Sequence, residues 1–210
     1  SVMASLYKVV LDYDAELVEI NPLVKTTSGE YVAADGRLLL DDNALFRHPE
    51  FEGKDTTRVD DTPWEAKARG KKLSYVDLDG SIGIIGNGAG LVMATLDAIQ
   101  LYGGRPANFL DAGGGASPEQ MAVALDIILS DPNVNVVFIN ILGGITRCDD
   151  VAKGILEAKK RVGFTKPIVI RLVGTNEEEG RRMLTEQGIH VLNSMEDAAA
   201  KAVEVAKAKG

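Results

Sequence analysis

Apolar side chains recur along most of the chain at one of two spacings, which predict helices or strands. Over residues 2–12 they follow the 3.6-residue period of a helix. No capping residue is evident before this segment, so we expect the chain to begin inside a helix and to be a piece of a longer protein. Short strands are predicted at residues 17–20, 23–26 and 31–35, and the turn sequence Thr-Ser-Gly-Glu makes the last two a hairpin.

From residue 64 onward, short apolar runs alternate with amphipathic segments. A helix (64–70) leads to a strand (73–78), for which the next strand (81–86) is the expected hairpin partner. Strands and helices then alternate, with Ser117 and Ser194 as expected helix caps. This alternation is typical of an α/β fold with a doubly wound parallel sheet. The remaining strands are predicted at 107–113, 135–142, 166–174 and 190–193, and the helices at 88–103, 117–130, 148–163, 176–188 and 194–209.

A charged stretch without periodicity separates these two patterns. It runs from His48 to Pro63 and has few aliphatic side chains, which is typical of a linker. The expected organisation is an N-terminal piece over residues 1–50, a linker over 51–63 and an α/β domain over 64–210.

Composition excludes several classes of protein. The net charge of −8 argues against a nucleic-acid-binding face, because phosphate binding needs a basic patch. No apolar run is long enough to span a bilayer, so a membrane partner is not expected. The single cysteine, Cys148, rules out an internal disulfide and suits a reducing compartment, either cytoplasm or mitochondrial matrix.

Three loops that follow predicted strands are rich in glycine, at residues 86–90, 111–117 and 142–150. Ligands of doubly wound sheets bind at the carboxyl ends of strands, and glycine lets backbone N–H groups approach an anion. The first loop lacks the spacing of a dinucleotide fingerprint, and a tight turn explains it equally well. The successive glycines of the second fit close packing, a ligand or an interface.

The third loop most favours a ligand site. It precedes a helix expected to open at about Thr146, so its glycines, this hydroxyl and Arg147 suit a phosphate or carboxylate. Asp149 and Asp150 fit the first helical turn through the helix dipole. A structural turn would not need Arg147. Cys148 has no histidine near it in the sequence, so we assign it no nucleophilic role.

The N-terminal piece holds a second polar set, Glu19, Asn21 and Asp35. Glu19 and Asn21 lie two apart on a predicted strand and share a face, and Asp35 ends the hairpin. Two carboxylates and an amide oxygen suit Mg²⁺ with nucleotide phosphates, although periodicity alone is explained by an exposed polar face. His48 and His190 show no partner spacing.

Five segments together resemble the β subunits of succinyl-CoA synthetases. In that family an ATP-grasp domain precedes a flavodoxin-like domain. The resemblance therefore implies that residues 1–50 are the end of an ATP-grasp domain and residues 64–210 a flavodoxin-like CoA-ligase domain. It extends over nearly the whole chain and rests on residues 18–23, 34–49, 86–97, 103–117 and 140–150.

The resemblance also implies residue roles. Asn21 and Asp35 match the family's Mg²⁺ ligands, and Glu19 matches the glutamate that faces a phosphohistidine at the nucleotide site. The implied substrate site consists of Asn87, Gly144, Ile145 and Thr146, to which the physical argument adds Arg147.

The family's chemistry needs a second chain. A partner α subunit binds CoA and carries the phosphorylated histidine, in αβ or α2β2 assemblies. ATP or GTP phosphorylates that histidine, succinate takes the phosphoryl group, and CoA displaces phosphate. Neither His48 nor His190 stands in the family's phosphohistidine motif. The segment that would contact the base is absent, so ATP and GTP stay open.

Two departures from the family pattern keep other functions open. Arg37 stands where many members have Lys, and Thr146 where others have Val. A hydroxyl beside the substrate carboxylate suits malate, so a malate–CoA ligase is an alternative. A non-catalytic module that binds an α subunit and a generic flavodoxin-like nucleotide-binding protein are two further alternatives.

Overall fold

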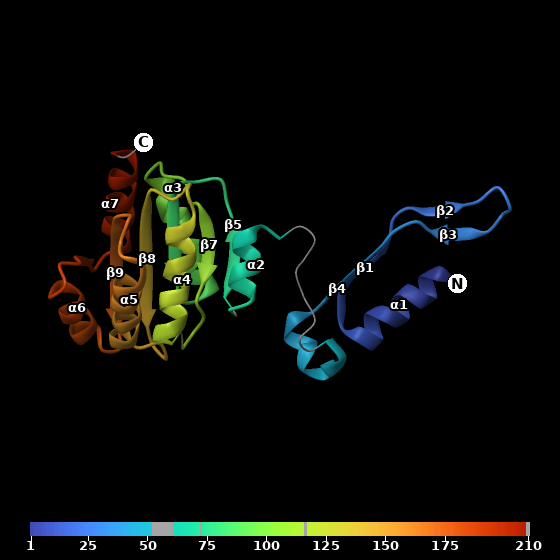
Figure 1. Cartoon of the computed structure of the whole chain (residues 1–210), viewed down its shortest axis with the longest axis horizontal. Coiled ribbons are helices and arrows are strands. Elements are labelled where there is room, and N and C mark those ends of the chain that lie inside the picture. The colour runs from blue at the N-terminus through green and yellow to red at the C-terminus, as the bar shows by residue number, and fades with distance from the viewer. Residues whose placement is uncertain (52–60, 72, 116, 209–210) are drawn as a thin grey trace. The chain divides into compact units, whose positions relative to one another are not determined.

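The computed structural model describes residues 1–51, 61–71, 73–115 and 117–208 (Figure 1). The chain divides into two compact units, residues 1–56 and 57–210, here called unit 1 and unit 2. Most of the predicted linker, residues 52–60, lies outside the described residues.

Unit 1 consists of a helix and two antiparallel strand pairs. Ser1 caps the first helix, because its side-chain oxygen accepts a hydrogen bond from the Ala4 N–H at 3.4 Å. The expectation of an uncapped helix start is therefore wrong. The predicted hairpin is confirmed as β2 paired with β3, and β1 pairs with a strand that we did not predict, β4. The elements are α1 (Val2–Tyr13), β1 (Ala15–Ile20), β2 (Leu23–Lys25), β3 (Tyr31–Ala33), β4 (Gly36–Leu40) and the 3₁₀ turns η1 (Asp42–Arg47) and η2 (Pro49–Phe51).

Unit 2 is built on a six-stranded sheet with the order β10-β9-β8-β6-β7-β5. Five strands are parallel and β5 is an antiparallel edge strand. Without β5, the order of the parallel strands is that of flavodoxin, so the predicted flavodoxin-like α/β class is confirmed. The strands are β5 (Ser74–Asp77), β6 (Ile82–Gly86), β7 (Asn108–Asp111), β8 (Val136–Gly143), β9 (Ile168–Gly174) and β10 (Val191–Leu192).

Helices cover both faces of this sheet (Figure 1). One face packs against α2, α4, α5 and α6, and the other against α3 and α7. Ser117 and Ser194 cap α4 and α7 as predicted. No described helix is long and apolar enough to cross a membrane. The helices are α2 (Pro63–Arg69), α3 (Ala89–Leu101), α4 (Pro118–Ser130), α5 (Cys148–Val162), α6 (Glu177–Thr185) and α7 (Met195–Lys207).

The predicted hairpin between residues 73–78 and 81–86 is wrong. β5 pairs with β7, which lies between β5 and β6. The connecting turn bonds to the chain entering β7, since the Ser81 N–H donates to the Arg105 carbonyl at 2.9 Å. A Cβ on Gly80 would lie 2.1 Å from that oxygen, so glycine permits this close passage. β6 is buried at every residue, and a central position between two parallel neighbours provides that burial.

Candidate functional site

The glycine loops gather at the carboxyl edge of the parallel sheet. β6 and β8 are neighbours, and the helices that follow them, α3 and α5, cover opposite faces. This divergence is the topological switch point at which doubly wound sheets bind ligands. Loop 1 (86–90) follows β6, loop 2 (111–117) follows β7, and loop 3 (142–147) follows β8.

Asn87 joins loop 1 to loop 3. Its side-chain Nδ2 donates to the Leu142 carbonyl at 2.9 Å, and its Oδ1 accepts from the Leu142 N–H at 2.9 Å. The amide thus pairs with the end of β8 as a strand peptide would. Asn87, which the resemblance assigns to substrate, therefore lies at the switch point with both polar atoms bonded to the backbone.

Two further side chains connect loop 2 to its neighbours. The Asp111 Oδ1 accepts from the Gly88 N–H at 2.6 Å and from the Gly113 N–H at 2.7 Å. The Thr146 hydroxyl, only 2% exposed, accepts from the Gly115 N–H at 2.7 Å. Asp111 was not among the predicted site residues, although an acid two residues before three successive glycines is a signal that the sequence offers.

Loop 3 carries backbone donors that no described group accepts, and it is open at Gly144 and Ile145. Helix α5 starts at Cys148, which agrees with the predicted range 148–163 rather than with an opening at about Thr146. The N–H groups of residues 144–147 donate no hydrogen bond within the described part of the chain. No heavy atom lies within 4 Å of where a Cβ on Gly144 would be, and Ile145 is 88% exposed. Consecutive free N–H groups before a helix form a site for a carboxylate or phosphate oxygen.

Arg147 is held beside this loop by a carboxylate. Its Nε and one terminal nitrogen each lie 3.2 Å from a different carboxylate oxygen of Asp149. This pairing, together with a hydrogen bond donated by the side-chain amide of Asn176, lowers the pKa of Asp149 to about 2. Half of the Arg147 side chain is exposed, so it can still meet an anion that approaches loop 3.

Two members of the polar set of unit 1, Glu19 and Asn21, lie together as the strand periodicity predicts. The Asn21 Nδ2 donates to the Glu19 Oε1 at 3.0 Å. The β1–β4 register pairs Ile20 with Gly36, and continuing it places Asn21 opposite Asp35. No group of three or more His, Cys, Asp or Glu suited to a metal occurs in the described residues. Two carboxylates and an amide fit Mg²⁺ when phosphate oxygens complete its coordination.

The two histidines and the cysteine have different surroundings. His48 is buried, and its Nε2 lies 2.8 Å from the Asp14 Oδ2. Cys148 is a buried free thiol whose pKa is raised by burial, which opposes a nucleophilic role. His190 lines a groove with β9 and α7 rather than the glycine loops.

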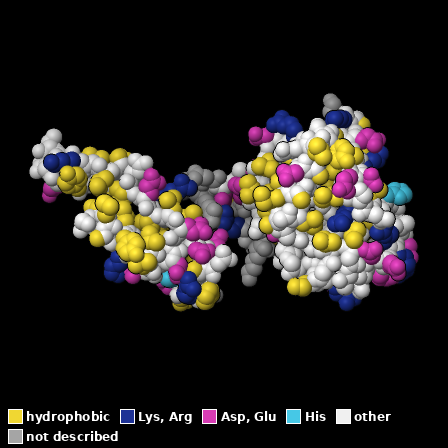
Figure 2. Space-filling view, turned by 180° about the vertical axis from the view of Figure 1, so that it is seen from behind, with side chains coloured by type: hydrophobic (Ala, Val, Ile, Leu, Met, Phe, Trp, Pro, Cys, Tyr) yellow, Lys and Arg dark blue, Asp and Glu magenta, His cyan; other side chains and the backbone are white. Residues whose placement is uncertain are grey.

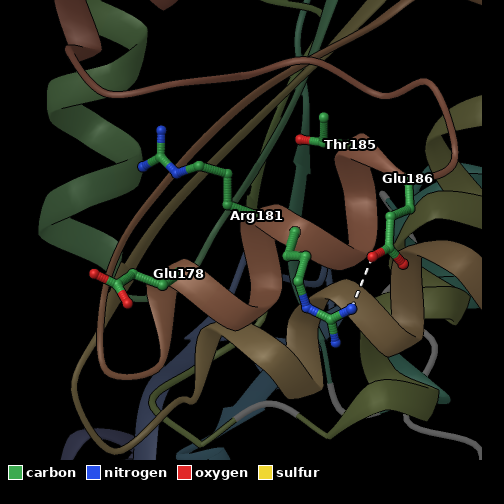
Figure 3. Close-up of a pocket in the computed structure, with 5 residues that line it drawn as sticks. Glu178, Arg181, Thr185 and Glu186 are labelled. Carbon is green, nitrogen blue, oxygen red and sulfur yellow. Dashed lines mark hydrogen bonds and ion pairs between the residues drawn. The ribbon is translucent and has the colours of Figure 1, made fainter.

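A hollow on α6 is distinct from this site. It has a volume of about 430 Å³, and Glu178, Arg181 and Thr185 are three of its lining residues (Figure 3). Arg182 is already paired with Glu186 at 2.7 Å. Charged side chains that pair along one helix are typical of a solvated face. This hollow therefore does not compete with the glycine loops.

Comparison with known proteins agrees with this arrangement. A family model described as CoA-ligase matches residues 85–205, which include all three glycine loops. The chain is 50% identical, over its whole length, to the protein named succinate–CoA ligase (ADP-forming) subunit beta in Desulfurococcus amylolyticus, and covers 55% of it. It is 54% identical to the beta 2 subunit of that name in Archaeoglobus fulgidus, with 99% of this chain and 55% of that protein covered.

Solved structures show the same fold. An ATP citrate lyase from Methanothrix soehngenii, solved with citrate and coenzyme A, superposes with a TM-score of 0.75 at 20% identity. The match covers 97% of this chain and 58% of the lyase. The chain thus spans about half the length of the curated relatives it matches. Because the family model covers more than half of its residues, the chain belongs to the CoA-ligase family.

Proposed function

We propose that the chain is the C-terminal part of the nucleotide-binding β subunit of a succinate–CoA ligase, acting in the citric acid cycle. The observation that carries this proposal is 50% identity over the whole chain to a protein of that name. The free N–H groups at residues 144–147 support it, since they suit a dicarboxylate or its acyl phosphate.

The reaction consists of two phosphoryl transfers followed by formation of a thioester from an acyl phosphate. The terminal phosphoryl group of ATP or GTP moves to a histidine nitrogen, and then to a succinate carboxylate oxygen. The CoA thiol attacks the resulting acyl carbon, and inorganic phosphate leaves. This chain contributes positioning and charge stabilisation, through Asn87, loop 3 and the N-terminus of α5.

The partner is an α subunit, in an αβ or α2β2 assembly, that supplies the reactive histidine and the CoA site. Of the two histidines here, His48 is buried against Asp14 and His190 lies away from the glycine loops. A phosphoryl acceptor from another chain is consistent with both placements.

In unit 1, Asn21 and Asp35 would hold Mg²⁺ and Glu19 would face the phosphohistidine. The metal neutralises charge on the nucleotide phosphates. The hydrogen bond between Asn21 and Glu19 orients both groups on one strand face. Residues 1–50 are the end of an ATP-grasp domain in this proposal, so the 210 residues alone are expected to be inactive. The location is the cytoplasm, or alternatively the mitochondrial matrix.

The test uses the natural full-length subunit co-purified with its α partner. Thioester formation from CoA is measured with succinate, malate, citrate and acetate, each with ATP and with GTP. Succinate-dependent turnover is expected, and the active nucleotide identifies the base specificity. Binding of the α partner without turnover of any acid would instead favour the non-catalytic module.

Thr146 favours malate as a second candidate substrate. Its hydroxyl accepts from Gly115 and keeps one proton to donate within the site. The prediction is that Thr146→Val in the full-length complex changes the ratio of succinate to malate turnover, whereas Thr146→Ser preserves it. An unchanged ratio in the valine variant would remove malate as an argued alternative.

A further inference from the structure

We propose that Asp111 is a positioning residue that holds the three glycine loops as one rigid rim and so directs anion binding to loop 3. The inference rests on the proposed function for its substrate, but the hydrogen bonds behind it belong to this chain alone. Asp111 would not touch the substrate.

The first step is the closed set of bonds between the loops. One carboxylate oxygen of Asp111 accepts from Gly88 in loop 1 and from Gly113 in loop 2. Thr146 ties loop 2 to loop 3, and Asn87 ties loop 1 to loop 3. Each loop is therefore bonded to both of the others, so moving one requires breaking bonds to two neighbours.

The second step concerns which donors remain for a ligand. Gly88, Gly113 and Gly115 are the residues whose positive φ angles (119°, 80° and 105°) shape loops 1 and 2. The N–H groups of all three point into these internal bonds. Gly113 and Gly115 of loop 2 thus act as a brace, meaning that their internal hydrogen bonds hold the loops together. The unbonded N–H groups of residues 144–147 are the anion donors.

The third step is energetic. A carboxylate that accepts two short backbone hydrogen bonds makes charge-assisted contacts, which are stronger than neutral ones. Without the carboxylate, the N–H groups of Gly88 and Gly113 would need other hydrogen-bond acceptors. The backbone can change conformation at both residues to reach them, because glycine has few steric restrictions. Loop 2 would then no longer be fixed against loop 1, and loop 3, which Thr146 joins to loop 2, would lose that support before the substrate binds.

The experiment compares Asp111→Ala, Asp111→Asn and Asp79→Ala in the full-length subunit with its α partner. Asparagine keeps a side-chain oxygen where both N–H groups converge. Asp79 is exposed, has no side-chain hydrogen bond within the described residues, and precedes β6 at the opposite end of the sheet.

Hydrogen exchange is followed in peptides spanning residues 86–90 and 111–115, with β8 as the folding control. KM and kcat are measured separately for the acid and the nucleotide.

In Asp111→Ala we expect faster exchange in both loop peptides, with β8 unchanged. KM for succinate should rise about tenfold, equivalent to about 1.4 kcal/mol of binding free energy, without a change in KM for the nucleotide. Asp111→Asn should recover most of both effects, and Asp79→Ala should match wild type. Unchanged hydrogen exchange in Asp111→Ala would refute the claim that Asp111 holds the loops together. Faster exchange with an unchanged KM for succinate would refute its role in positioning them for the substrate. If wild type turned over no acid, the proposed function would fail while the exchange measurement still decided the brace.

Discussion

At the scale of single residues, asparagine side chains complete the sheet where the backbone does not. The Asn108 Oδ1 accepts from the Ile84 N–H and its Nδ2 donates to the Ile84 carbonyl, both at 2.9 Å. The β6–β7 ladder itself registers a single pair, Gly86 with Asp111. Asn108 is fully buried, so its amide replaces a neighbouring strand's peptide inside the core. Asn87 makes the same bidentate contact with Leu142 at the sheet edge.

Removing this amide should be costly. Asn108→Ala leaves the Ile84 N–H and carbonyl without partners in the core. An unsatisfied buried group costs about 1–3 kcal/mol, so for these two groups we expect the free energy of unfolding to fall by about 2–6 kcal/mol. Urea denaturation followed by circular dichroism measures it. Asn133→Ala, at an exposed position, is the control and should stay within about 0.5 kcal/mol of wild type. An equal effect of both substitutions would refute this role of Asn108.

The residues that carry these contacts show where prediction from sequence stops. Asn87 was a predicted site residue through the family resemblance, and Thr146 through the resemblance and its place before a predicted helix. Their partners, Leu142 and Gly115, were not predictable, since each contact joins loops that are far apart in sequence. Asp111 was missed because its bond to Gly88 joins loops 1 and 2, which are far apart in sequence, although its bond to Gly113 is local.

At the scale of elements, the start of α5 depends on one ionised carboxylate. Asp149 accepts bonds from Arg147 and Asn176, which lower its pKa to about 2, below the value of about 3.9 for an unfolded Asp. A lowered folded-state pKa means that this stabilisation is present above about pH 4. It is lost as the pH falls toward 2, because protonation then favours the unfolded chain.

Asp149→Asn should therefore flatten the pH dependence of stability. Between about pH 4 and pH 2 the free energy of unfolding should fall less steeply in this variant than in wild type. Chemical denaturation at half-unit pH steps measures the slope. Asp79→Asn, at an exposed position, is the matched control and should keep the wild-type slope. A wild-type slope in Asp149→Asn would contradict the assignment.

Packing between helices depends on a glycine inside α5. A Cβ at Gly154 would lie 2.4 Å from the Pro118 carbonyl oxygen and 2.8 Å from the Met121 Cβ, both in α4. Alanine favours a helix by about 1 kcal/mol, but overpacking costs about 1–3 kcal/mol, so Gly154→Ala should lower stability. Gly90→Ala in α3, with no atom within 4 Å, should be neutral or slightly stabilising in the same thermal denaturation. A more stable Gly154→Ala variant would show that α4 and α5 separate freely.

Element identity was easier to predict than strand pairing. Apolar periodicity and serine caps located α4 and α7, since both signals are local. The antiparallel pairing of β5 with β7 was missed, because the tight passage at Gly80 depends on a segment 25 residues further along, at Arg105. β4 was missed because its five residues contain only three apolar side chains, at one end and without alternation.

At the scale of the whole molecule, the apolar core is unevenly divided between the units. Ala44 is the one buried apolar side chain among the described residues of unit 1, whereas both core clusters lie in unit 2. Hydrophobic side chains are visible on the surface of unit 1 (Figure 2). The most exposed are Met3, Phe46, Tyr7, Tyr31 and Leu11. Unit 1 therefore has little hydrophobic burial of its own to offset the loss of chain entropy.

This division predicts how separate pieces of the chain behave. Residues 61–210 should fold alone and unfold cooperatively, with a Tm within about 5 °C of the main transition of the 210-residue chain, because their core is complete. Residues 1–51 should show no cooperative transition, since a piece of this size that buries one small apolar side chain cannot offset its conformational entropy. Thermal denaturation by circular dichroism and the dispersion of amide proton shifts measure both. A sharp transition in residues 1–51 would mean that polar contacts such as those of Asp14 with Arg47 and His48 suffice to hold unit 1 together.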